Sequence, residues 1–217
     1  MLLKKVTIHK YKSFLTEQTY EVESQITRIV GKNESGKTAL LEALAKSNYF
    51  EDNADFQFDK DLDYPRSELT KVRTENPRVL TCEYELSDED VKSVEDVFAE
   101  GIISKQRFSV TSYYDNTRTT TGVSTDFGVF KDWLISAFGV GEQGKELIHA
   151  ATDYPSLVSV VSENNSLPGM NEIKAELEKI KKGANGWTNP LEGYIYKTYI
   201  SPAIPKLWYF IVYFSLP

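Results

Sequence analysis

The chain has 217 residues, 41% of them hydrophobic and 26% charged, and it carries a formal net charge of −7. These proportions are ordinary for a soluble globular protein, and the length allows one large domain or about one and a half ordinary ones. The negative charge argues against a protein that coats nucleic acid through bulk charge, although it leaves room for a local basic groove.

The cysteine count and the hydropathy pattern bear on the cellular compartment. The single cysteine, Cys82, excludes an intrachain disulfide and suits a reducing cytosol. The N-terminus passes directly into a strand pattern without a signal peptide, and no apolar run approaches the roughly 20 residues that span a membrane. His9 and His149 have no neighbouring Cys or His, so a zinc site has little support. We expect a cytoplasmic protein without membrane contact.

The first part of the chain contains predicted strands and one helix. Alternating apolar residues predict strands over residues 3–10 and 18–22, and residues 25–30 (QITRIV) read as a third strand. Residues 38–46 (TALLEALAK) are strong helix formers without Gly or Pro and predict a helix. Residues 49–64 are rich in Asp, Asn and Phe, and we expect a surface loop there.

The middle of the chain is predicted to be mainly antiparallel. Residues 79–86 (VLTCEYEL) alternate cleanly, which is typical of a half-buried antiparallel strand. Ser87 and Asp90 have the spacing of a capping box and predict the start of a helix. Two more strands are expected over residues 107–114 and 117–123, joined by a turn. This arrangement differs from the simple βαβαβ alternation of a small kinase or GTPase.

From residue 128 the pattern becomes helical. A helix is predicted over residues 171–182, with Gly183 as the residue that ends it. The most apolar run, residues 207–216 (LWYFIVYFSL), predicts a buried strand. A chain that stops on such a strand is expected to be cut off within a domain.

One segment carries a chemical pattern. The G-x-x-x-x-G-K-[ST] motif is matched at every fixed position by Gly31, Lys32, Asn33, Glu34, Ser35, Gly36, Lys37 and Thr38. The predicted strand before it and the predicted helix after it would aim backbone N–H groups and a helix N-terminus at a phosphate. The alternative is a chance match in an ordinary strand–helix turn. Because both flanks fit, we expect this P-loop to bind a nucleoside triphosphate.

The P-loop residues have separate expected roles. Gly31 and Gly36 let the backbone approach phosphates where a Cβ would clash. The amides of residues 33–38 form an anion nest, Lys37 reaches the β- and γ-phosphates, and the Thr38 hydroxyl is a ligand for Mg²⁺. Hydrolysis also needs an acidic residue after a second buried strand, and no run of four apolar residues followed by Asp-Asp or Asp-Glu occurs. The loop is therefore expected to bind ATP and Mg²⁺ without supplying the groups that cleave ATP.

These patterns together predict an α/β fold with α+β character. We expect a P-loop NTPase head with a mixed sheet, an antiparallel β-subdomain and a helical segment. The expected division is an N-terminal lobe over residues 1–127, a helical insertion over 128–200, and the start of a further core strand over 201–217.

The order of these motifs resembles a known family. The opening strand, Tyr11-Lys12-Ser13-Phe14 and a strand that enters the P-loop resemble the N-terminal head of ABC-type ATPases of the OLD (overcoming lysogenization defect), RecF and SMC class, which includes AAA-labelled ATPases. Asp63-Tyr64-Pro65-Arg66, residues 85–88 and the aromatic run 208–217 add to the likeness. The likeness runs through most of the chain, but only the P-loop is specific by itself.

The resemblance implies ATP held between two heads of a homodimer that acts on DNA, in repair or in phage defence. In OLD proteins a C-terminal TOPRIM domain carries a nuclease. The resemblance also places Lys12 near the nucleotide, although an exposed lysine at a strand end is the alternative, and it suggests Gln57 as a metal-sensing glutamine. The chain departs from the family by lacking a Ser-Gly-Gly signature, a second acidic motif and a switch histidine. It is therefore expected to be the front portion of such a protein and a weak or inactive ATPase when isolated.

Two other functions stay open at this point. A self-contained P-loop phosphotransferase or GTPase would show turnover by the isolated chain and a base-reading motif such as Asn-Lys-x-Asp. A non-catalytic interaction module with a relic P-loop would bind no ATP at all.

Overall fold

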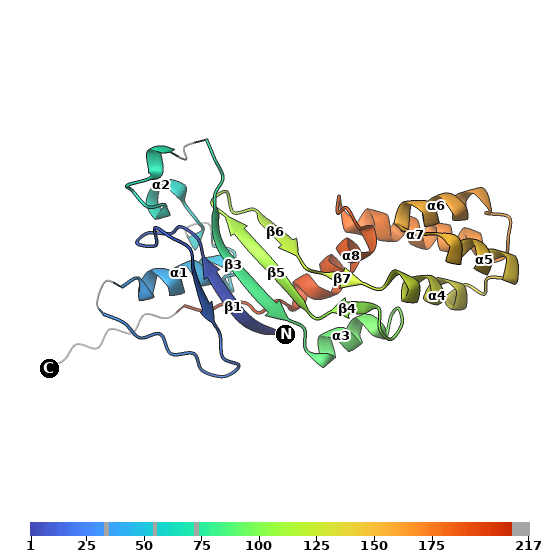
Figure 1. Cartoon of the computed structure of the whole chain (residues 1–217), viewed down its shortest axis with the longest axis horizontal. Helices are drawn as coiled ribbons and strands as arrows, with labels where there is room; N and C mark the ends of the chain where they lie inside the picture. The colour runs from blue at the N-terminus through green and yellow to red at the C-terminus, as the bar shows by residue number, and fades with distance from the viewer. Residues whose placement is uncertain (33–34, 54–55, 72–73, 210–217) are drawn as a thin grey trace. The chain divides into compact units, whose positions relative to one another are not determined.

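The computed structural model describes residues 1–32, 35–53, 56–71 and 74–209 (Figure 1). The chain divides into two compact units. The sheet unit holds residues 1–85 and 107–122 and the segment from Pro205 onward, and the helical unit holds residues 86–106 and 123–204. The sequence assigns residues 86–106 to the first lobe, whereas in the structure they pack within the helical unit.

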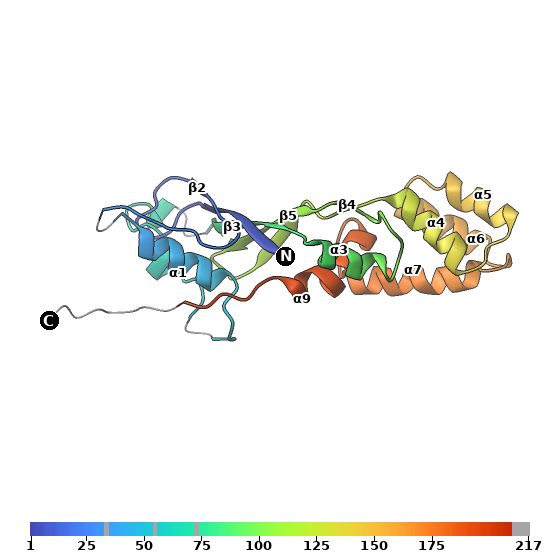
Figure 2. The same ribbon diagram turned by 90° about the horizontal axis from the view of Figure 1, so that it is seen from below.

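The sheet unit is built on five antiparallel strands in the order β2-β1-β3-β5-β6. The predicted strands over 3–10, 18–22, 79–86, 107–114 and 117–123 are confirmed as β1 (Leu2–Ile8), β2 (Gln18–Glu21), β3 (Arg78–Glu85), β5 (Arg107–Tyr113) and β6 (Arg118–Thr121). The helix α1 (Lys37–Ser47) lies along one face of this sheet, as Figure 2 shows. Two short helical segments, α2 (Lys60–Asp63) and the 3-10 turn Leu69–Lys71, fall between α1 and β3.

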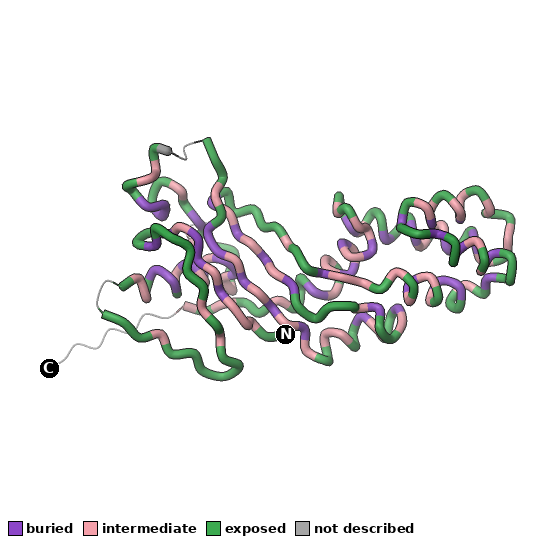
Figure 3. The backbone as a smooth tube through the Cα atoms, viewed as in Figure 1, coloured by how far each residue is buried: buried purple, intermediate pink, exposed green. Residues whose placement is uncertain are grey.

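The strand register explains why one face of the sheet is apolar. Val6 is paired with Cys82, which in turn faces Val110, so the three side chains form a row across β1, β3 and β5. Buried positions, in purple, alternate with partly buried ones, in pink, along β3 and β5 (Figure 3). Burial raises the pKa of the Cys82 thiol to about 11, so the thiol stays protonated at neutral pH and serves as a core residue.

The predicted strand over residues 25–30 is wrong. Ile26 and Val30 are 70% and 88% exposed, and no strand is assigned there. The Thr27 hydroxyl accepts a hydrogen bond from the Glu23 N–H at 2.8 Å, which indicates a local turn. Alternation favours a strand only where a neighbouring strand takes up its N–H and C=O groups, and none of the described strands lies beyond β2 at that edge.

The helical unit begins at a confirmed capping box. The Ser87 hydroxyl accepts from the N–H of Asp90, and the Asp90 carboxylate accepts from the N–H of Ser87, at the start of α3 (Asp88–Glu95). Two short strands, β4 (Ile103–Lys105) and β7 (Ser124–Thr125), pair with each other. The remaining elements are α4 (Phe127–Ala137), α5 (Glu142–Ala150), α6 (Tyr154–Glu163), α7 (Met170–Ala184), α8 (Pro190–Ile195), a π-helical turn (Tyr196–Ile200) and α9 (Ser201–Ala203).

The helix α7 runs past the residue predicted to end it. Gly183 lies inside the helix, where a Cβ would come within 2.5 Å of the Tyr194 ring of α8. Glycine is therefore needed at this position for close packing of α7 on α8, and the helix ends at Asn185, which is left-handed at φ 48°.

The predicted strand over residues 207–216 is described only at its start. Leu207 forms a parallel bridge with Tyr49, directly after α1. The Leu207 N–H donates to the Asn48 carbonyl at 2.9 Å, and the Phe50 N–H donates to the Leu207 carbonyl at 3.1 Å. Residues 210–216 lie outside the described residues.

A buried histidine in the sheet unit should make stability depend on pH. His9 hydrogen-bonds through Nδ1 to the Glu17 carboxylate at 2.6 Å and through Nε2 to the Thr81 hydroxyl at 2.8 Å. Burial lowers the His9 pKa; Glu17 opposes this shift and Arg78 adds to it. Because the unfolded chain then binds the proton more readily, the free energy of unfolding should fall by about 1 kcal/mol between pH 7.5 and pH 5.5.

Urea unfolding at the two pH values measures this loss. The His9→Gln variant should lose most of the pH dependence, whereas His149→Gln, at an exposed position, should keep it. An unchanged pH slope in His9→Gln would assign the acid sensitivity to other groups.

Candidate functional site

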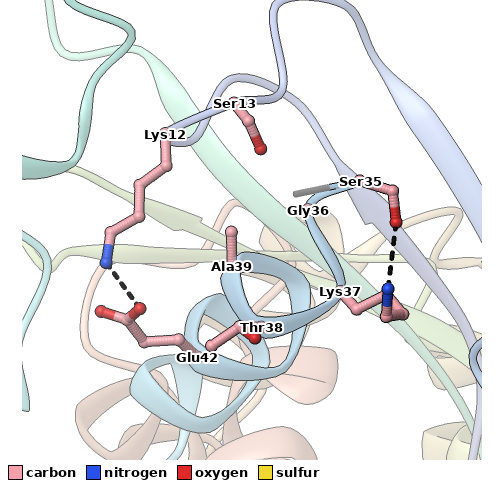
Figure 4. A pocket seen from close by; sticks show the side chains of 8 residues that line it. All are labelled: Lys12, Ser13, Ser35, Gly36, Lys37, Thr38, Ala39 and Glu42. Atoms are coloured by element: carbon pink, nitrogen blue, oxygen red, sulfur yellow. Dashed lines mark hydrogen bonds and ion pairs between the residues drawn. The ribbon is translucent and has the colours of Figure 1, made fainter. Parts of the chain in front are cut away.

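The sheet unit has a pocket of about 540 Å³ at the N-terminal end of α1. P-loop residues meet the turn between β1 and β2 there, as Figure 4 shows. The lining residues are Lys12, Ser13, Ser35, Gly36, Lys37, Thr38, Ala39 and Glu42. The structure thus brings together the P-loop and the Tyr11-Lys12-Ser13-Phe14 segment, which lie more than 15 residues apart in sequence.

The N-terminus of α1 is suited to an anion. Its N-cap residue, Gly36, has φ 89° and ψ 2°, a left-handed conformation that glycine adopts without strain. A Cβ on Gly36 would approach the Phe14 ring to 2.9 Å and the Ser13 hydroxyl to 3.0 Å, so the turn also packs closely on the loop. Gly36 has no side chain that could cap the helix, and the first turn of α1 contains no acidic residue. The first N–H groups and the positive end of the helix dipole are therefore available to a phosphate.

The P-loop lysine is folded back onto its own loop. The Lys37 ammonium donates to the carbonyl oxygens of Gly31 at 2.7 Å and Lys32 at 2.6 Å, and to the Ser35 hydroxyl at 3.4 Å. These are neutral acceptors on an exposed loop, whereas phosphate oxygens carry negative charge. A phosphate adds a charge–charge attraction to the Lys37 ammonium that the neutral carbonyl and hydroxyl acceptors lack, so it would draw Lys37 away from the loop.

The β1–β2 turn presents Lys12 to the same pocket. Tyr11 and Phe14 exchange backbone hydrogen bonds across the turn, and Lys12 at its tip has φ 49°. The Lys12 N–H donates to the Asp63 carbonyl at 2.6 Å. The Lys12 ammonium is 2.5 Å from a carboxylate oxygen of Glu42, and the two side chains point toward each other in Figure 4.

The structure locates the other predicted site residues as follows. Thr38 lines the pocket in the first turn of α1, where its hydroxyl could reach a metal bound to the phosphates. Asn33 and Glu34 lie outside the described residues. Gln57 is exposed and is not among the residues that line the pocket, and its role as a metal-sensing glutamine stays a prediction.

Sequence reasoning missed three residues around the pocket: Ser13, Glu42 and Asp63. Ser13 and Asp63 belong to segments that carry the family resemblance, Tyr11–Phe14 and Asp63–Arg66, but no role followed from that resemblance. Glu42 gave no signal, because a glutamate in a helix is ordinary. Only the fold places it opposite Lys12.

The sequence matches the family described as "AAA ATPase domain" over residues 1–202. The chain belongs to this family. Membership implies a nucleotide-binding ATPase domain, which agrees with a mixed helix-and-sheet fold and with the P-loop at the start of α1. The pocket of the AAA ATPase domain fits a magnesium-bound nucleotide, because it joins an uncapped helix N-terminus, two lysines and the Thr38 hydroxyl.

The comparisons with curated proteins and with solved structures say less about this chain than the family match does. The search of curated proteins found no match to this chain. One matching solved structure is described as "Structural biochemistry of ATP-driven dimerization and DNA stimulated activation of SMC ATPases". It is 16% identical with a TM-score of 0.36 and covers 74% of this chain and 99% of that chain, a likeness too low to support a conclusion. None of the described helices is long and apolar enough to cross a membrane.

Proposed function

We propose that this AAA ATPase domain binds Mg-ATP at the N-terminus of α1. The observation that carries the proposal is the left-handed Gly36 at an uncapped helix start, with Lys37, Thr38 and Lys12 around one pocket. The helix N–H groups and Lys37 would hold the phosphates, and Thr38 would be the protein ligand of Mg²⁺. The metal, when bound, neutralises phosphate charge. Gln57 stays a second candidate for contact with it.

We further propose that the domain acts as the ATP-binding head of an OLD/RecF-like ABC-type ATPase in the cytoplasm. The support is the resemblance of the Tyr11–Phe14 and Asp63–Arg66 segments around a P-loop. In this proposal two heads dimerise around ATP and act on DNA, in repair or in phage defence. Among the described residues that line the pocket, the one carboxylate is Glu42, and its ion pair with Lys12 leaves it poorly placed to polarise water. We therefore expect weak hydrolysis by the isolated chain.

Isothermal titration of Mg-ATP into wild type and Lys37→Ala tests the nucleotide site. Wild type should bind, and Lys37→Ala should bind at least about 30-fold more weakly, because a charge-assisted contact to the phosphates is lost. The control is Lys5→Ala, which removes another lysine of the sheet unit, one that is paired with Glu21 at 3.4 Å away from the pocket. Equal affinity of wild type and Lys37→Ala would exclude the proposed site.

The same proteins test the head proposal. Sedimentation with and without ATP, followed by addition of duplex DNA, should show ATP-dependent dimers and DNA binding for wild type, and neither for Lys37→Ala. A monomer that binds ATP but neither dimerises nor binds DNA would limit the proposal to nucleotide binding.

A further inference from the structure

Four charged side chains form a closed network beside the pocket. Glu42 is 2.5 Å from Lys12 and 3.4 Å from Lys46, through different carboxylate oxygens. Asp63 is 2.8 Å from Lys46 and 3.8 Å from Lys12. Two positive and two negative charges therefore balance, and each lysine faces both carboxylates.

The network is buried at one end and open at the other. The side chains of Asp63 and Lys46 are 3% and 10% exposed, whereas that of Lys12 is 38% exposed and lines the pocket. The Asp63 carboxylate also accepts the Asp59 N–H at 3.1 Å, which fixes it further. Lys12 is thus the most exposed member of the network, whereas Asp63 and Lys46 form its buried end.

The backbone of Lys12 is held in place, so that its side chain alone can move. A left-handed φ of 49° is uncommon for lysine and is maintained by the surrounding turn and by the bond to the Asp63 carbonyl. From this fixed point the long side chain can turn toward Glu42 or into the pocket. A lysine ammonium is a compact charge on a flexible stem, which suits such an exchange.

A bound phosphate would compete with Glu42 for the Lys12 ammonium. Glu42 lies one helical turn after Thr38, and both residues line the pocket. A triphosphate at the start of α1 would bring several negative charges to a site that already holds the Glu42 carboxylate. Lys12 would then gain more from the phosphates than from one carboxylate.

Glu42 would keep other partners if Lys12 moved away. Lys46 remains at 3.4 Å. The buried Tyr11 hydroxyl forms no hydrogen bond of regular geometry with the described residues, and burial, followed by the charges and the closeness of the Asp63 and Glu42 carboxylates, raises its pKa. This hydroxyl therefore stays protonated near both carboxylates and can act as a replacement donor.

We propose that Glu42 is a positioning residue that holds the Lys12 ammonium when no phosphate is present. When a triphosphate binds, the Lys12 ammonium leaves Glu42 and pairs with the phosphates. The inference rests on the proposed function, since it concerns regulation of the same site. Glu42 thereby lowers nucleotide affinity, because the Lys12–Glu42 ion pair must be broken before Lys12 can pair with the phosphates.

Removing the Glu42 charge should therefore tighten binding. We expect Glu42→Gln to bind Mg-ATP about fivefold more tightly than wild type, the size of a partly exposed ion pair. Inorganic tripolyphosphate should show the same gain, since the exchange involves phosphates alone. Lys12→Met should weaken binding of both ligands, and Glu42→Gln should have no further effect in the Lys12→Met background.

The test is isothermal titration of wild type, Glu42→Gln, Lys12→Met and the double variant, with Glu21→Gln as control. Glu21→Gln breaks the Lys5–Glu21 pair outside the pocket and should leave affinity unchanged. Thermal unfolding shows whether each variant is folded. If Glu42→Gln does not fold, Glu42→Asp replaces it in the test, and its shorter side chain, which reaches Lys12 less well, should give a smaller gain in affinity. Wild-type affinity in both Glu42 variants would overturn the inference while the proposed function stands.

The cycle also separates two causes of tighter binding. A gain that persists in the Lys12→Met background would mean that Glu42 simply repels phosphate, and this result also overturns the transfer of Lys12. Absence of binding by wild type to both ligands would overturn the proposed function, and the inference with it.

Discussion

Replacing Phe130 with alanine should lower the free energy of unfolding of the helical unit by about 3–5 kcal/mol. Phe130 in α4 has 0% of its surface exposed. Its ring centroid lies 5.8 Å from that of Trp133 and 6.5 Å from that of Tyr154, both in stacked orientation, and 6.3 Å from that of Phe98. Truncation removes the ring contacts and leaves a cavity that three large neighbours cannot fill.

Urea unfolding monitored by tryptophan fluorescence measures this loss, since Trp133 stacks directly on the deleted ring. The matched control is Phe127→Ala, the same change in the same helix at a half-buried position, which should cost clearly less. Similar losses for the two variants would mean that the aromatic cluster around Phe130 is not the core of this unit.

The regular elements could be predicted because their patterns are local. The strand over 79–86 alternates because one face packs on α1 and the other is polar, and β3 reproduces it within one residue. The capping box at Ser87 was predictable for the same reason, since its two hydrogen bonds join residues three apart.

Two errors came from contacts that are distant in sequence. Residues 25–30 have a strand pattern, but a strand depends on a partner, and sequence periodicity cannot show whether one is present. Gly183 has the composition of a helix end, yet it is glycine because Tyr194 of α8 approaches it. In both cases tertiary structure overrode a sound local rule.

The candidate site was predictable in its phosphate-binding half alone. Gly36, Lys37 and Thr38 belong to a contiguous motif whose spacing is typical of phosphate binding. Glu42 and Asp63 have no such motif, and their positions beside Lys12 depend on how α1, α2 and the β1–β2 turn pack together. The residues proposed to tune the site are therefore the ones that sequence reasoning did not find.

Replacing Asp63 with alanine should lower the free energy of unfolding of the sheet unit by about 3 kcal/mol. The Asp63 carboxylate is 3% exposed and accepts from Lys46 at 2.8 Å and from the Asp59 N–H at 3.1 Å. Its removal leaves the Lys46 ammonium, 10% exposed, with the longer contact to Glu42 as its one remaining ion pair among the described residues. An uncompensated buried charge is a large penalty, whereas the ion pair itself need not be a large gain.

The cost should come from the charge left behind, and two further variants test this cause. Asp61→Ala, two residues earlier at an exposed position of the same short helix, should change stability by less than about 0.5 kcal/mol. The double variant Asp63→Ala with Lys46→Met removes both charges and should recover a substantial part of the loss, because no ammonium is then buried without its partner. A double variant as unstable as Asp63→Ala would instead assign the loss to the Asp59 N–H bond and to packing at the end of α2. The Asp63 carbonyl, which binds the Lys12 N–H, is retained in every variant, so the turn beside the pocket keeps its backbone anchor.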